Sequence, residues 1–592
     1  MEYKDLDNQY KWDLTLIYKD PADFDTDMDK ARKVLTQMTN AKDTFTTNPE
    51  NLLAFLDNEV TLDRLVSKMY CFAHLHADVE PANQDWQALM SRVLTFNEEV
   101  TKALDFTGLS IIKAKDNVSA WMTQEEFAPY RFKLSQVLRE EEHLLSQEME
   151  TLLGKVSSIS DVSSRVFDAM RPDYDDVIVD GEPQPLNPAS LNAFLEHPDQ
   201  DVRRQAYQNF YKEYKRFENV YAQTLSGVMK KDAFYADVRK FKDPLAASQW
   251  NDDVPEELFY IILKKANEDY RPLFHKYNAL KKKLLKLDTL WNYDLFTPLV
   301  DASKRKFTIE ECWEIILDVT SVFGEEYTNI IKQARKEHWI DFMPADGKRM
   351  GAYSSGCYDT RPYILTNFIG NYDSLSTMIH ELGHSCHTFL SSKYQHPATS
   401  DYRIFVAEVA STVNETLLIN YMLDHAGTKE EEAYYLYEFL ENCVGLIFRQ
   451  PMYAQFEDTL HQWASHDEPM NAARITELYD KINADYYGPD VKNDPLVGHS
   501  CFYIPHFYYN YYVYKYTLGM SVALAIVSRI QNHKPHQVGD YLEFLKSGGS
   551  DTPLGVLAKA GVNPLEDNLY DDAFNYFGDI LARFEKIMDE SA

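Results

Sequence analysis

Residues 373–387 read DSLSTMIHELGHSCH, and this stretch decides how the chain around it is interpreted. Apolar Met378, Ile379 and Leu382 surround the two central histidines in a pattern typical of a helix. Asp373 is placed to cap the first turn of that helix. Helical periodicity of the same kind fills most of the 592 residues, so the sequence predicts a mainly α fold.

His380 and His384 lie four residues apart, so a helix projects both from one face about one turn apart. Two neutral imidazoles in this arrangement can bind one Zn²⁺ at about 2.0–2.1 Å each. Glu381 follows the first histidine and can reach a metal-bound water as general base. This H-E-x-x-H pattern is typical of zinc peptidases. A chance match is the alternative, but the mid-helix position after a predicted strand argues against it.

A catalytic zinc usually takes a third protein ligand, and two residues compete for that position. His387 is nearly two turns from His380, so three ligands from one straight helix are awkward. Glu408 is a lone acid among small and apolar residues on a second predicted helix. A buried carboxylate is costly unless it is paired or metal-bound, so Glu408 is favoured over an exposed position and over His387. Glu415, two turns later, is a candidate to orient a ligand histidine.

A third feature is the aromatic stretch 504–516, which reads IPHFYYNYYVYKY. His506, Tyr509 and Tyr512 recur at a spacing of three, which on a helix drifts slowly around the axis. Such O–H and N–H donors can stabilise the oxyanion of a tetrahedral intermediate. The alternative is a buried aromatic core helix, and the sequence leaves both open.

Glycines punctuate residues 341–372, unlike the sequence around them. The apolar and β-branched run 363–369 predicts a strand in a small sheet beside the zinc helix. The stretch 351–367 could supply an edge strand that binds an extended peptide through main-chain hydrogen bonds. A phosphate-binding loop is the rival interpretation, but the stretch lacks the Gly-Lys-Ser/Thr ending and leads into a strand.

Patterning along the rest of the chain predicts three regions. Residues 1–120 form a helical region, and residues 121–198 a helical region that ends in a short β segment at 177–179 before Asp180-Gly181. Residues 199–592 form the catalytic region, whose first helix has Asp199 as its predicted N-cap.

Composition narrows the class of protein. A net charge of −33 and a pI near 4.9 argue against nucleic-acid binding. The N-terminus has no apolar segment typical of a secretory signal, and the longest apolar run, 520–527, is far too short to cross a membrane. The six cysteines have no metal-type pairing, which indicates reduced thiols in the cytoplasm. They are Cys71, Cys312, Cys357, Cys386, Cys443 and Cys501.

Together these stretches resemble the oligoendopeptidase F family, relatives of thimet oligopeptidase. The resemblance rests on residues 380–384, the segment FVAEVASTVNE at 405–415, IPHFY at 504–508, GAYSSG at 351–356 and the early WDL at 12–14. It implies a cytoplasmic zinc endopeptidase that cuts short oligopeptides and spares folded proteins. It also implies an elongated multi-helix body with a deep substrate channel and one zinc ion on its floor.

The resemblance also assigns roles by position. It implies that His380, His384 and Glu408 are the zinc ligands and that Glu381 is the catalytic base. His506, Tyr509 and Tyr512 match the His/Tyr oxyanion cluster of thimet-type relatives, although the abundance of tyrosine leaves the register open. His499 has no place in this scheme.

The sequence therefore predicts an endopeptidase that hydrolyses internal bonds of oligopeptides through a metal-activated water. One alternative is a zinc carboxypeptidase on a similar helical fold, with Arg361 or Arg403 as a clamp for the terminal carboxylate. The other is a non-catalytic helical protein that binds peptides.

Overall fold

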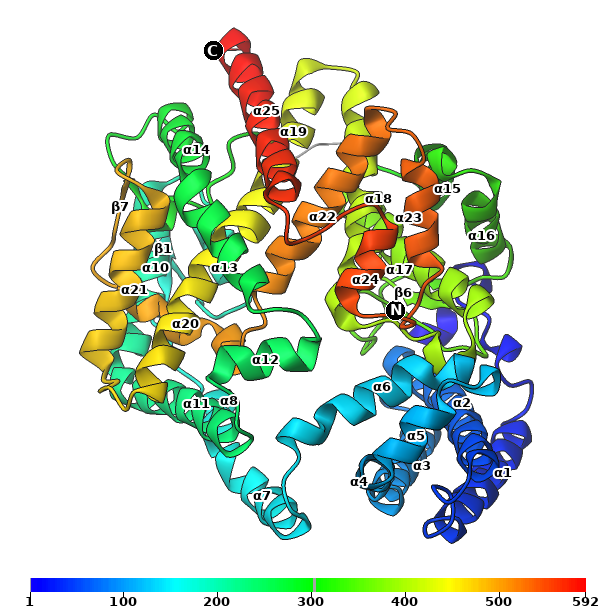
Figure 1. Ribbon diagram of the computed structural model, residues 1–592. Coiled ribbons are helices and arrows are strands. Elements are labelled where there is room, and N and C mark those ends of the chain that lie inside the picture. Colours follow the sequence, from blue (N-terminus) through cyan, green and yellow to red (C-terminus); the bar gives the residue numbers. More distant parts are fainter. Residues whose placement is uncertain (1, 302–304, 592) are drawn as a thin grey trace. The chain divides into compact units, whose positions relative to one another are not determined.

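The computed structural model describes residues 2–301 and 305–591, which form mainly helices and three small sheets (Figure 1). The predicted mainly α class is confirmed. Contacts divide the chain into two compact units, each assembled from three separate stretches of sequence. The first unit comprises Met1–Glu142, Ser303–Tyr421 and Ile526–Asn563, and the second comprises His143–Ala302, Met422–Ala525 and Pro564–Ala592. The three regions predicted along the sequence, and the deep channel, stay predictions.

The N-terminal part of the first unit consists of helices joined by short connections, as the scarcity of glycine in this part of the sequence predicts. The helices of the whole unit are α1 (Pro21–Asn40), α2 (Pro49–Val79), α3 (Gln84–Ala103), α4 (Thr107–Lys113), α5 (Lys115–Trp121), α6 (Arg131–Arg139), α15 (Ile309–Thr320), α16 (Glu325–Lys336), α17 (Tyr372–Tyr394), most of α18 (Ile404–Asp424), α23 (Gln537–Leu545) and α24 (Pro553–Lys559).

A three-stranded sheet of the first unit joins this helical core to α17. Its order is β4 (Ile340–Asp341), β6 (Tyr363–Leu365), β5 (Tyr353–Ser355), with β6 parallel to β4 and antiparallel to β5. Buried Tyr363 and Leu365 belong to the same apolar cluster as Trp12 and the N-terminal helices. The Tyr363 hydroxyl also donates to the Asp13 carbonyl at 2.9 Å, so residues 12–14 pack on the sheet.

The strand predicted over 363–369 is shorter than expected. It ends at Leu365. Gly370, at φ 74°, then turns the chain into α17. The N-cap of α17 is Asn371, whose side chain accepts from the backbone N–H of Ser374 at 3.0 Å. The assignment of the cap to Asp373 was wrong: Asp373 lies in the first turn, where a carboxylate still favours the helix dipole.

The second unit is also mainly helical. The β segment predicted at 177–179 forms and pairs with residues 182–184 in a hairpin, with Asp180 and Gly181 at φ 51° and 86° in its turn. Asp199 caps α10 as predicted. Its elements are α7 (Gln147–Ser160), α8 (Val162–Ala169), β1 (Val177–Val179), β2 (Glu182–Gln184), α9 (Leu191–Leu195), α10 (Gln200–Arg216), α11 (Glu218–Val238), α12 (Pro244–Asp252), α13 (Glu257–Lys264), α14 (Arg271–Leu284), β3 (Leu290–Trp291), α19 (Lys429–Cys443), α20 (Gln450–Ser465), α21 (Ala472–Tyr487), β7 (Val491–Lys492), most of α22 (Tyr514–Gln531) and α25 (Asp567–Ser591).

Across residues 2–301 and 305–591, no helix is both long enough and apolar enough to span a membrane.

Candidate metal centre

Two neighbouring helices of the first unit, α17 and α18, bring three metal-ligating side chains together. The Nε2 atoms of His380 and His384 lie 3.2 Å apart. The Oε2 atom of Glu408, on α18, lies 3.6 Å from Nε2 of His380 and 3.5 Å from Nε2 of His384. These three residues form a group that could hold a metal ion.

The spacing of these atoms can be tested against a zinc ion. Ligands about 2.0–2.1 Å from a tetrahedral centre lie about 3.3 Å from one another. The observed separations of 3.2, 3.5 and 3.6 Å match that edge length. Two imidazoles and one carboxylate are also the donor set of many catalytic zinc sites, so the residues present fit zinc.

Gly383, inside the H-E-x-x-H motif, sets how closely the two helices approach. A Cβ atom at this position would lie only 2.8 Å from both the Ala410 carbonyl oxygen and the Ser411 Cα atom of α18. Nearby, the Asn414 side chain donates to the Ile379 carbonyl at 3.1 Å. Glu408, the candidate third ligand, therefore reaches the two histidines because the helix backbones pack directly on each other.

Carboxylates and hydroxyls surround the three candidate ligands. The Nδ1 atom of His380 lies 3.3 Å from Oε2 of Glu415, the residue predicted to orient a ligand histidine. Ser376 donates to the other Glu415 oxygen at 3.3 Å. Ser411 donates to Glu408 Oε2 at 3.0 Å. Each of these contacts restricts the orientation of a candidate ligand or of its partner.

The acidic surroundings change the titration of the cluster. Burial alone would lower the pKa of His380, but the nearby carboxylates, chiefly Glu415, raise it to about 9. The hydrogen bond to His384 lowers the pKa of Glu408 to about 2. Burial raises the pKa of Glu381, whose side chain is buried directly beside His380. The site therefore favours positive charge between the imidazoles and the carboxylates, as a cation site should.

His387, the alternative candidate for the third ligand, does not belong to the cluster of His380, His384 and Glu408. It is fully buried and its ring stacks on Tyr402, with centroids 3.7 Å apart at 4°. Within the part of the chain that the structure describes, neither ring nitrogen has a hydrogen-bond partner. The expectation that Glu408 is buried was wrong, because its side chain is 53% exposed. Its apolar neighbours pack on other faces of α18, while its carboxylate lies at the accessible side of the cluster.

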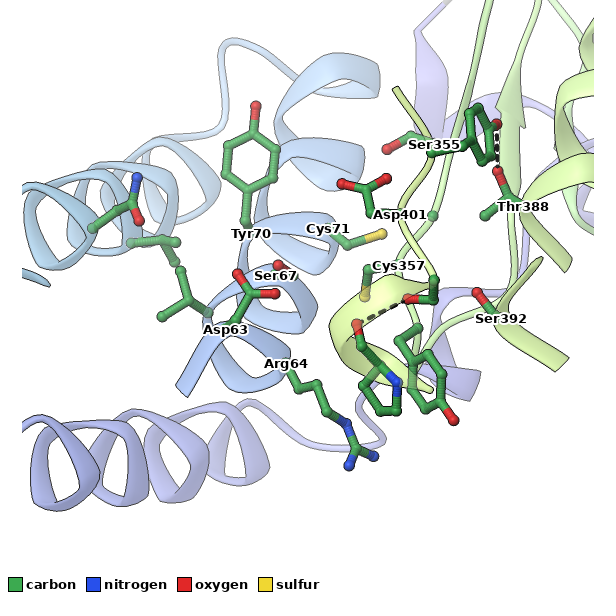
Figure 2. A pocket seen from close by; sticks show the side chains of 18 of the residues that line it. Asp63, Arg64, Ser67, Tyr70, Cys71, Ser355, Cys357, Thr388, Ser392 and Asp401 are labelled. Carbon is green, nitrogen blue, oxygen red and sulfur yellow. Dashed lines mark hydrogen bonds between the residues drawn. The ribbon is translucent and has the colours of Figure 1, made fainter. Parts of the chain in front are cut away.

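A cavity of about 400 Å³ in the first unit borders the same helix (Figure 2). Thr388 and Ser392 of α17 line it, and they continue the row of His380 and His384 at four-residue intervals. Figure 2 shows residues of α2, among them Asp63 and Ser67, across the cavity from Ser355, Cys357 and Thr388. Arg64 of the same wall is already paired with Asp359 at 2.6 Å. The cavity thus begins about one turn beyond the candidate ligands.

His506, Tyr509 and Tyr512 belong to the second unit and form a ring cluster there. They do not lie on one helix as predicted: Pro505–Tyr508 is a short 3-10 turn, and α22 starts only at Tyr514. The rings still meet edge to face, with centroids 6.0 Å apart for His506–Tyr509 and 6.3 Å for Tyr509–Tyr512. Tyr516, which the sequence analysis did not single out, closes the cluster at 5.4 Å from Tyr512.

Three further residues named from the sequence have partners away from the candidate ligands. Arg361 donates to Glu337 at 2.8 Å, and Arg403 donates to the Gln136 side chain at 3.0 Å. His499 is buried and pairs with Glu218 at 2.9 Å in the second unit. The charge of Arg361 is therefore matched within the chain, which weakens it as a clamp for a terminal carboxylate.

A helix that carries H-E-x-x-H, with a candidate carboxylate ligand on a neighbouring helix, is typical of a metallopeptidase. A family model described as peptidase family M3 matches residues 193–576, and one described as oligopeptidase F matches residues 114–171. The chain belongs to peptidase family M3. It is accordingly a metalloendopeptidase, as the sequence predicts.

Relatives and solved structures match almost the whole chain. It is 34% identical to oligopeptidase PepF of Bacillus subtilis, over 98% of this chain and 87% of that protein. It is 31% identical to the chromosomal oligoendopeptidase F of Lactococcus lactis subsp. cremoris, over 98% of this chain and 97% of that protein. A crystal structure of a Chlamydophila abortus protein superposes with a TM-score of 0.92 at 28% identity, covering 99% of both chains. Oligoendopeptidase F of Enterococcus faecium superposes with a TM-score of 0.73 at 29% identity, covering 96% of this chain and 100% of that chain.

Proposed function

We propose that the chain binds one Zn²⁺ through His380, His384 and Glu408 and hydrolyses internal bonds of short oligopeptides. The observation that carries this proposal is the convergence of the three ligand atoms at separations of 3.2–3.6 Å. The names of the relatives, oligopeptidase and oligoendopeptidase, support oligopeptides as the substrate class.

Bound zinc supplies Lewis-acid chemistry, because it lowers the pKa of a water molecule and polarises the scissile carbonyl. Glu381 takes the proton from the attacking water and later delivers it to the leaving nitrogen. Its position supports this role, since it follows His380 on α17 and its side chain is buried. Burial raises the pKa of the Glu381 carboxyl above its ordinary value, and this suits a group that must accept and release a proton.

The resemblance to thimet-type relatives is what supports His506, Tyr509 and Tyr512 as hydrogen-bond donors to the oxyanion. Their rings form one cluster, and Tyr509 is 57% exposed and thus accessible to a substrate. The exposure of Tyr509 and the short 3-10 turn at Pro505–Tyr508 argue against the alternative of a buried aromatic core helix.

The peptide binds along the free edge of β5 in this proposal. β5 is the last strand in the order β4-β6-β5, and Ser354 joins it to Ser385 of α17 at 2.8 Å. Ser355 and Gly356, at the end of β5, line the 400 Å³ cavity. A peptide that extends β5 can therefore place a side chain in the cavity while its backbone passes the metal ligands.

We also place the protein in the cytoplasm. The six cysteines are free thiols, which supports a reducing compartment.

The test is a product map of defined peptides with both termini blocked. We expect cleavage at internal bonds, loss of cleavage with a chelator, and recovery with stoichiometric Zn²⁺ that elemental analysis finds at one ion per chain. Cleavage that requires a free C-terminus would indicate the carboxypeptidase alternative. Full activity in a metal-free preparation would contradict the proposal.

A further inference from the structure

The cavity beside the candidate metal centre combines apolar and acidic walls. Tyr70 and Leu94 line it and are 42% and 45% exposed, so large apolar side chains are open to a ligand there. Asp63 of α2 and Asp401, in the segment between α17 and α18, line the same cavity (Figure 2). All these residues belong to the first unit, as do α17 and β5, so the cavity is formed within one unit.

The two carboxylates of the cavity have no cation of their own. Across residues 2–301 and 305–591, neither side chain forms an ion pair or a hydrogen bond. Arg64, the arginine of the cavity wall, donates to Asp359 through two hydrogen bonds of 2.6 and 2.8 Å. The charge of Lys133 also acts on Asp63, but Lys133 pairs with Glu59 at 2.8 Å. The cavity therefore carries negative charge that its own side chains do not neutralise.

Partial burial increases the attraction of this acidic pair for a cation. It raises the pKa of both carboxyls. At Asp63 the charge of Lys133 opposes this rise, and the charge of Asp401 adds to it. A carboxylate that has lost part of its hydration gains more from a bound cation than one in open water does. Because the two acids act on each other, one cationic group between them stabilises both.

The backbone that carries the two acids is held in place before any ligand binds. Asp63 lies inside α2, and the arginine pair described above ties this helix to the segment after β5. Two residues before Asp401, the Thr399 carbonyl accepts from the Gly549 N–H at 2.8 Å. A ligand therefore meets acids whose backbone is already ordered, which lowers the entropic cost of binding.

We infer that this cavity is a specificity pocket for a lysine or arginine side chain of the substrate, with Asp63 and Asp401 as its acceptors. The inference rests on the proposed function and deepens it. A basic side chain matches both kinds of wall, because its aliphatic stem packs on apolar surface such as Tyr70 and Leu94 while its charged end reaches the acids. An acidic side chain at the same place would be repelled.

The position of the cavity predicts which substrate residue enters it. Thr388 and Ser392 lie four and eight residues beyond His384, which is about 6 and 12 Å along α17. An extended peptide advances about 3.3 Å per residue. A peptide that pairs with the edge of β5 and runs along α17 therefore brings to the cavity a side chain about two to four positions from the scissile bond.

The first test uses the full, zinc-loaded protein and internally quenched peptides that differ at one position. Each peptide carries lysine, Nε-acetyl-lysine or glutamate at a position two to four residues from the cleaved bond, on either side. Acetyl-lysine keeps the stem and removes the charge. At the position that enters the pocket, we expect kcat/KM to be about 10-fold higher for lysine than for acetyl-lysine, and lowest for glutamate. Equal rates for lysine and acetyl-lysine at all these positions would overturn the inference.

Asp63→Asn and Asp401→Asn test whether these two residues cause the preference. Each substitution keeps the size of the side chain and removes its charge. We expect each to reduce the preference for lysine over acetyl-lysine by about 3-fold, and the double variant to abolish it. The rate for the acetyl-lysine peptide should stay within about 2-fold of the wild type in all three variants.

Asp43→Asn is the matched control. Asp43 is exposed in the turn between α1 and α2, and its substitution changes the net charge of the chain by the same amount. The preference for lysine should be unchanged in this variant. An equal fall in Asp43→Asn, or an intact preference in the double variant, would contradict the assignment of the pocket.

Binding measurements separate this inference from the proposed function. Glu381→Gln leaves Asp63 and Asp401 in place, and fluorescence anisotropy measures its affinity for the same peptides. We expect the lysine peptide to bind about 10-fold more tightly than the acetyl-lysine peptide. If the wild type cleaves internal bonds without this preference, the pocket assignment alone is wrong. If the wild type cleaves none of the peptides, the proposed function is wrong, and equal binding of the two peptides would overturn the pocket as well.

Discussion

The Nδ1 atom of His380 lies 3.3 Å from Oε2 of Glu415, while Nε2 of the same ring faces His384 and Glu408. A carboxylate on Nδ1 fixes the tautomer that presents Nε2 to a metal, and it increases the basicity of the ligand. Glu415 is therefore placed to orient His380 as a metal ligand, although it is not one of the three candidate ligands.

Glu415→Gln should weaken zinc binding by about 10–100-fold and leave the maximal rate at saturating zinc much less affected. The amide keeps the shape of the side chain but loses the charge. Competition with a chromogenic chelator measures the affinity. Ser376→Ala, which removes only the donor to Glu415, is the matched control and should have a smaller effect. Identical zinc affinity in Glu415→Gln and the wild type would contradict the orienting role.

Glu381→Gln should lower kcat by about 10²–10⁴-fold, because the amide cannot accept the proton of the attacking water. Zinc content and peptide affinity should be unchanged, since Glu381 is not one of the three ligands. Elemental analysis and binding of a fluorescent peptide measure both. Turnover near the wild-type rate would assign proton transfer to another group.

Gly383→Ala should destabilise the protein by about 1–3 kcal/mol and also lower its zinc affinity. The added methyl group would lie 2.8 Å from backbone atoms of α18, so the helices that carry the ligands must separate. Urea unfolding of the metal-free protein measures the first effect, and chelator competition the second. Gly108→Ala in α4 is the control: its Cβ meets nothing within 4 Å, so stability should be unchanged or slightly higher. Equal behaviour of the two variants would argue against close helix packing as the reason for glycine at 383.

His387→Phe should make the unfolding free energy less sensitive to acid. Burial lowers the pKa of His387 to about 3, so the folded state keeps this imidazole neutral. Below about pH 6.5 the unfolded chain gains a proton that the folded chain does not, and stability is lost as the pH falls. At pH 5 this loss is about 2 kcal/mol, and phenylalanine removes it while preserving the stack on Tyr402.

Urea unfolding of the metal-free wild type and His387→Phe at pH 7 and pH 5 checks this prediction. The variant should gain about 2 kcal/mol relative to the wild type between the two pH values. A constant difference would mean that His387 is protonated in the folded state. Retention of zinc by the variant would agree with its separation from the ligand cluster.

Local chemistry explains which parts of the site the sequence could predict. The spacing of His380 and His384 is a property of one helix, so the pair needed no tertiary information. Glu408 was identified from the cost of an isolated acid, yet its carboxylate is half exposed. Glu408 nevertheless lies in the candidate metal-binding cluster, and its exposure could not be predicted because apolar neighbours along a helix do not reveal which face of the helix is open.

Long-range contacts explain what the sequence could not predict. His506, Tyr509 and Tyr512 were grouped on a helix by their spacing, but the backbone turns between them. The backbone N–H of Tyr511 in this turn donates to Glu457 of α20, 54 positions earlier in the chain, and no local pattern signals that contact. Asn371, and not Asp373, is the N-cap of α17, because the turn at Gly370 ends the preceding segment one residue before Asn371.

The alternation of sequence segments between the two units has a consequence for synthesis. The first unit needs residues up to Asn563, and the second needs residues from Pro564 onward. The first unit cannot complete its core until residues 526–563 have been translated, and the second cannot do so until residues 564–592 have been translated, so neither unit can fold fully while the earlier segments are being synthesised. The apolar faces of the N-terminal helices stay exposed until the later segments of the same unit have been synthesised. Chaperone assistance during expression should therefore raise the yield of active enzyme.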